Sequence, residues 1–96
     1  MTQIVINTRD GGFGLSEAAM ELYGAFCRDA EIAPCEYDSD IPRDSQQLLS
    51  VVKVLGERAS GPYARLKIVT IPDDVEWTIM EYAGSEWVAE AHRTWS

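Results

Sequence analysis

The fold is decided near the amino end of the chain, where residues 4–16 read IVINTRDGGFGLS. Three successive β-branched residues at the start of this stretch predict a buried strand. Asn7 and Thr8 end the strand, because their side chains compete for backbone hydrogen bonds. Ser16 is a good cap for a following helix, since its hydroxyl can accept a hydrogen bond from the first helical turn. The stretch therefore predicts a strand, a glycine loop and a helix N-terminus.

The glycine loop within this stretch admits two interpretations. Its glycines either serve a tight structural connection, or they let backbone N–H groups and the helix dipole hold an anion with help from Arg9. The spacing is neither the dinucleotide fingerprint nor a P-loop, and the carboxylate of Asp10 would repel an anion. Both interpretations stay open. The candidate ligand-binding residues are Asn7, Thr8, Arg9, Gly11, Gly12, Gly14 and Ser16.

Two helices are predicted by apolar residues at steps of three and four. The first covers residues 17–29, with Leu15 and Met20 placed to form a hydrophobic staple around Ser16. The second begins at Asp44 as its cap, with Gln47 completing a capping box. It ends at residues 60–62, which read Ser-Gly-Pro.

From residue 66 onward the apolar residues alternate, which predicts strands. We expect these strands over residues 66–71, 75–82 and 85–93, with a two-residue hairpin turn at Ala83 and Gly84. The chain is then one α+β domain over residues 1–96. Its predicted order is β-α-α-β-β-β, with two helices packed on one face of a mainly antiparallel four-stranded sheet.

The hairpin turn also predicts which side chains share a face. If Tyr82 pairs with Ser85, one face carries Trp77, Ile79 and Val88, together with a polar pair of Glu90 and His92. If the helices cover this face, the other face is either exposed apolar surface, which is typical of an interface, or is covered by the tail or the second loop. The candidate interface residues are Met80, Tyr82, Trp87, Arg93 and Trp95.

Composition limits the class of protein and of partner. The chain has 96 residues, of which 46% are hydrophobic, and a formal net charge of −8. Such a surplus of acids opposes direct binding to nucleic acid or to a membrane, and favours a basic protein partner such as a nucleic-acid-binding protein. With two cysteines and one histidine we expect no metal and no cofactor. We expect no secretion signal and no membrane helix, so the predicted location is cytoplasmic.

Distinctive motifs lie at both ends of the chain, and a shorter one lies between them, whereas residues 31–38 carry little of the pattern. The motifs are INT and GGFGLS within residues 6–16, DIPRD at 40–44, IPDDVEW at 71–77 and HRTW at 92–95. In these motifs the chain resembles a family of small proteins from phages, prophages and some large viruses. The resemblance covers nearly the whole chain, although Ala83 and Gly84 stand where the family pattern has Asp-Gly. It implies a viral or mobile-element setting rather than an activity.

Two functions stay open. The first is a virus-encoded interaction protein that inhibits a host defence component by non-catalytic binding in the host cytoplasm, as anti-CRISPR proteins do. The second is a small-ligand or nucleotide-sequestering protein that uses the glycine loop. The exposed hairpin face can serve either contact with a target protein or a homodimer. We expect no enzyme, because one histidine and scattered serines form no catalytic spacing.

Overall fold

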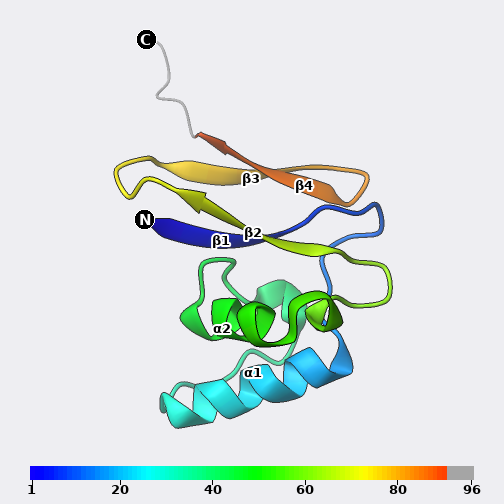
Figure 1. Ribbon diagram of the computed structural model, residues 1–96, viewed down its shortest axis with the longest axis vertical. Helices are drawn as coiled ribbons and strands as arrows, with labels where there is room; N and C mark the ends of the chain where they lie inside the picture. Colours follow the sequence, from blue (N-terminus) through cyan, green and yellow to red (C-terminus); the bar gives the residue numbers. More distant parts are fainter. Residues whose placement is uncertain (91–96) are drawn as a thin grey trace.

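The computed structural model describes residues 1–90, and in them the α+β class and the predicted order of elements are confirmed (Figure 1). The elements are β1 (Thr2–Asn7), α1 (Glu17–Asp29), the 3-10 turn η1 (Asp38–Asp40), α2 (Gln46–Leu55), the 3-10 turn η2 (Gly56–Ala59), β2 (Leu66–Ile71), β3 (Trp77–Tyr82) and β4 (Ser85–Glu90).

Within the described residues the strands form two separate antiparallel sheets, β1–β2 and β3–β4, in place of the single four-stranded sheet that we expected. The first sheet pairs Thr2 with Ile71 at one end and Asn7 with Leu66 at the other. In the second sheet the predicted hairpin register is confirmed along its length, from Tyr82 opposite Ser85 to Trp77 opposite Glu90.

The division into two sheets has a local cause at the edge of β1 that faces away from β2. The N–H of Val5 donates to the carbonyl oxygen of Arg43 at 2.8 Å, and the N–H of Asn7 donates to the Glu86 carboxylate at 2.8 Å. These two donors are the ones a third strand would need. Because a loop backbone and a side chain already occupy them, the hairpin cannot extend the β1–β2 ladder there.

The elements are stacked in layers around β1 (Figure 1). Helix α2 packs against β1 and β2, and α1 packs against α2 on the outside. Val5 belongs to the apolar core under the helices. Side chains alternate along a strand, so Ile4 and Ile6 point to the opposite face, where the hairpin lies. They are 0% and 4% exposed, and β1 is therefore buried from both sides.

The hairpin packs on the β1–β2 sheet and not on the helices (Figure 1). The two helices do lie on one side of a sheet, as expected, but that sheet is β1–β2 alone, and it separates the hairpin from them. The inward-facing hairpin residues Trp77, Ile79 and Val88 are half-buried, as the predicted sharing of faces requires. The predicted separation of the hairpin into an inner and an outer face is therefore supported by burial.

The helix caps show how much the local sequence decides. The Ser16 hydroxyl accepts from the N–H of Ala19 at 3.1 Å, which confirms the predicted cap of α1. The predicted cap of α2 at Asp44 is wrong by one residue. Ser45 takes that role, and its hydroxyl accepts from the N–H of Leu48 at 3.3 Å. Both serine and aspartate are good caps, so composition alone does not choose between neighbours.

Candidate functional site

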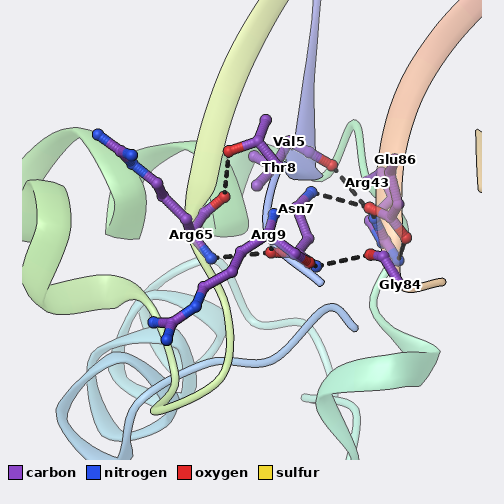
Figure 2. A network of polar contacts seen from close by, with 8 residues as sticks. All are labelled: Val5, Asn7, Thr8, Arg9, Arg43, Arg65, Gly84 and Glu86. Carbon is purple, nitrogen blue, oxygen red and sulfur yellow. Dashed lines mark hydrogen bonds and ion pairs between the residues drawn. The ribbon is translucent and has the colours of Figure 1, made fainter. Parts of the chain in front are cut away.

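The carboxyl end of β1 is organised by the buried side chain of Asn7, which is 0% exposed (Figure 2). Its amide nitrogen donates to the carbonyl oxygens of Arg9 and Gly84, both at 2.7 Å. Its amide oxygen accepts from the N–H groups of Arg65 at 2.8 Å and Arg9 at 3.2 Å. All four hydrogen-bonding positions of the side chain are therefore used within the chain. Asn7 has none left for a ligand, contrary to its place among the candidate ligand-binding residues.

The turn of the β3–β4 hairpin packs against the glycine loop. Gly84 has φ +91°, and a Cβ added to it would lie 2.6 Å from the backbone nitrogen of Gly11 and closer still to that of Gly12. The N–H of Gly11 donates to the carbonyl oxygen of Ala83 at 3.4 Å. The glycines of the loop and of the turn thus let two backbones approach closely.

Further donors of this junction are also used by the chain itself. The N–H of Leu15 donates to the carboxylate of Asp38 at 3.0 Å, and the N–H of Ser16 donates to the carbonyl oxygen of Ala59 at 2.9 Å. The carboxylate that lies near the start of α1 is therefore the side chain of Asp38, which belongs to the chain itself. The sequence offered no signal that would have singled out Asp38 among the acids of its loop.

An ion pair between Arg43 and Glu86 fixes the hairpin against β1 (Figure 2). The contact is bidentate, with Nη2 of Arg43 2.9 Å from Oε2 of Glu86, and the two side chains are only 18% and 9% exposed. The guanidinium also lies 3.7 Å from the centre of the Phe13 ring. Arg43 therefore joins three regions: the glycine loop, β1 and β4. The pair is not predicted from the sequence, although Glu86 is an acid on the inward face of the hairpin.

The outer face of the hairpin carries the candidate interface residues that the structure describes. Met80 and Trp87 are directly opposite each other and are 45% and 47% exposed, while Tyr82 is 79% exposed. Glu90 is exposed at the end of β4, opposite Trp77. The remaining expected members, His92, Arg93 and Trp95, lie outside the described residues.

Thr8 and Arg9 are candidate ligand-binding residues that do not lie in the glycine loop. They line an open cleft of about 930 Å³ between the end of β1, η2 and the start of β2. Its other walls include two further cations, Arg65 and Lys67, and one carboxylate, Glu57. The sequence could not show this grouping, because the pairing of β1 with β2 brings these residues together.

Cys27 and Cys35 are free thiols, and Cys27 is buried in the core as a small apolar residue. Burial, reinforced by a hydrogen-bonding partner at Cys35, raises the pKa of the nearby Tyr23 to about 12. Among residues 1–90 no group of three or more His, Cys, Asp or Glu side chains is placed to hold a metal ion.

No helix in the described part of the chain is long and apolar enough to cross a membrane. Comparison with known proteins gave no match: no family model, no curated protein and no solved structure is significantly similar to this chain.

Proposed function

We propose that this protein acts by non-catalytic binding of another protein through the outer face of its β3–β4 hairpin. The observation that carries the proposal is the exposure of Met80, Tyr82 and Trp87 on one face. Exposed apolar side chains gathered on a small protein are typical of interaction sites, and Trp and Tyr are enriched among residues that dominate binding energy. The face is also rigidly supported, because the inner side of the same hairpin is held by the Arg43–Glu86 pair.

The charges around this face define the chemistry of the partner. Exposed acids are found in the turn before the hairpin, at Asp73, Asp74 and Glu76. A partner that presents an apolar patch bordered by lysine and arginine would complement them, and the net charge of −8 would accelerate its association. The partner is therefore a basic protein.

The biological setting of the proposal comes from the resemblance to phage, prophage and large-virus proteins. Nucleic-acid-binding components of host defence are basic proteins that such a virus must overcome. We therefore propose that the protein inhibits a defence component in the host cytoplasm by occupying its surface, in the manner of anti-CRISPR proteins.

A phage-plating experiment tests this proposal. Bacteria with a defined CRISPR–Cas system would express the wild-type protein, the variant Trp87→Lys, or the control Val54→Lys. Val54 lies on α2 and is 61% exposed, so the control adds the same charge at an exposed apolar position on another surface. We expect the wild type and the control to restore plating of a targeted phage. With Trp87→Lys the plating efficiency should be at least about tenfold lower than with the wild type. Equal plating with both variants would exclude the hairpin face, and no restoration by the wild type in a panel of such systems would exclude this defence role.

Two measurements on the purified proteins separate binding from folding. Trp87→Ala should keep the circular dichroism and thermal transition of the wild type, because its side chain points away from the rest of the chain. Trp77→Ala should lower the unfolding temperature markedly, because Trp77 packs on the inner face. In sedimentation experiments the wild type should be a monomer. A dimer that Trp87→Ala dissociates would make a second copy the occupant of this face, and would contradict the proposal of a different, basic partner.

A further inference from the structure

The cleft beside the end of β1 is separate from the hairpin face and carries an opposite charge. Three of the eight Lys and Arg residues of the chain line it, at Arg9, Arg65 and Lys67, against one carboxylate at Glu57. All three cations are exposed, and within residues 1–90 none of them forms an ion pair. At physiological ionic strength the Debye length is about 8 Å, so distant acids are screened. The exposed carboxylate of Asp10 is next to Arg9 in the sequence and opposes an anion, but it does not line the cleft, where the cations outnumber the carboxylate.

The two arginines are held on a common rigid base. The N–H groups of Arg9 and Arg65 both donate to the same amide oxygen of the buried Asn7, at 3.2 Å and 2.8 Å. The carbonyl oxygen of Arg65 accepts from the N–H of Thr8 at 2.8 Å and from its hydroxyl at 3.1 Å. Both guanidinium groups lie on the side away from the Arg43–Glu86 pair, and they diverge there, that of Arg65 toward the upper left and that of Arg9 toward the lower left (Figure 2). Because the backbones of both arginines are already fixed, the protein loses less conformational entropy when a ligand bridges the two side chains.

We propose that this cleft binds a small molecule that carries two or more phosphate groups. Arginine presents a planar fork that matches phosphate oxygens in pairs, and a lysine adds a mobile point charge. The Ser60 hydroxyl, whose oxygen accepts from the N–H of Leu66 at 3.0 Å, keeps its proton to donate to the ligand. A cleft of about 930 Å³ is in the size range of ligand sites and exceeds the size of a single phosphate. This site is independent of the proposed protein-binding face.

Calorimetric titration with ATP, tripolyphosphate and adenosine tests the assignment. We expect saturable binding of ATP and of tripolyphosphate to the wild-type protein, and none of adenosine. Arg9→Gln and Arg65→Gln should each raise the dissociation constant about tenfold or more, since each removes a charged hydrogen-bond donor. Only the side chains change, so the backbone contacts with Asn7 are kept, and circular dichroism should confirm an unchanged fold.

Arg28→Gln is the matched control, because Arg28 is an exposed arginine in the last turn of α1 and does not line the cleft. It should change the dissociation constant less than about twofold. An equal loss in the control would mean non-specific attraction and would overturn the site. So would the absence of saturable binding to the wild type. Binding of ATP without binding of tripolyphosphate would show that the base rather than the phosphates is recognised, which also contradicts the proposal.

Discussion

The glycine loop and the cleft flank the same strand end, yet their polar groups are used in opposite ways. In the loop, the N–H groups of Gly11, Leu15 and Ser16 bond to the hairpin turn, to a carboxylate and to a carbonyl oxygen of the chain itself. In the cleft, the side chains of Arg9 and Arg65 have no ion-pair partner among residues 1–90. Buried backbone donors must be satisfied within the fold, whereas exposed side-chain cations can be left for a ligand. A glycine loop before a helix is therefore weaker evidence of an anion site than charges gathered by strand pairing.

The largest effect that bears on this comparison is expected from Asn7→Ala. The substitution removes four internal hydrogen bonds at a fully buried position, so it should lower the free energy of unfolding by about 3 kcal/mol or more. The neighbouring Thr8→Val removes one exposed side-chain hydrogen bond and should cost less than about 1 kcal/mol. Denaturant unfolding of both variants measures the difference. Similar losses would mean that Asn7 does not organise the strand end.

A smaller loss of stability is expected from replacing a glycine of the hairpin turn or of the glycine loop by alanine. Comparing the two variants distinguishes the effect of close packing from that of backbone strain. Gly84 and Gly12 have nearly equal positive φ values, +91° and +92°. A Cβ on Gly84 would collide with the loop backbone, whereas one on Gly12 would meet nothing within 4 Å. Both variants to alanine carry backbone strain of about 1 kcal/mol or more, and Gly84→Ala should lose a further 1–3 kcal/mol, approximately, from overpacking.

Thermal unfolding of the two glycine variants provides the measurement, with the wild type as reference. The unfolding temperature of Gly84→Ala should fall clearly below that of Gly12→Ala. If the order were reversed, the turn would not dock in the loop, and the loop donors would be available for an anion after all.

The smallest loss of stability among the three comparisons is expected from Ser16, which ends the glycine loop and caps α1. Ser16→Ala removes the cap of α1 and the hydrogen bond from its hydroxyl to the carbonyl oxygen of Arg58 at 2.6 Å. The loss should be about 1 kcal/mol. Ser45→Ala, which removes the longer capping bond of α2, is the matched variant and should cost no more than Ser16→Ala. Denaturant midpoints that coincide with the wild type would show that the helix start does not need its own cap.

The features that were predicted correctly depend on residues close together in the sequence. The hairpin register follows from the two-residue turn at Ala83 and Gly84, and the start of α1 follows from Ser16. The choice between Asp44 and Ser45 failed because both residue types satisfy the same local requirement. Local rules thus determine the elements and the hairpin register, but not every element end. β3 begins at Trp77 and not at residue 75, and α2 ends at Leu55, where the 3-10 turn η2 follows, and not at residues 60–62.

The features that were missed depend on residues far apart in the sequence. The separation into two sheets follows from the contacts that Arg43 and Glu86 make at the edge of β1. A signal for this was present, because alternation places Glu86 beside Val88 on the inward face, where a carboxylate needs a cation. The partner could not be chosen from the eight cations of the chain without the fold. The cleft was missed for the same reason, since Arg9 and Arg65 meet only through the pairing of β1 with β2.

The position of β1 between two layers has a consequence for synthesis on the ribosome. One edge of β1 can pair only after β2 has been made, and its other edge can bond only after Glu86 has been made. At roughly 5–20 residues per second, the 79 residues from Asn7 to Glu86 take about 4–16 s to be translated. During that interval the strand on which the fold is built remains without its final partners. Folding of this chain is therefore completed late and through contacts of long sequence separation, which is the slow regime for a small domain.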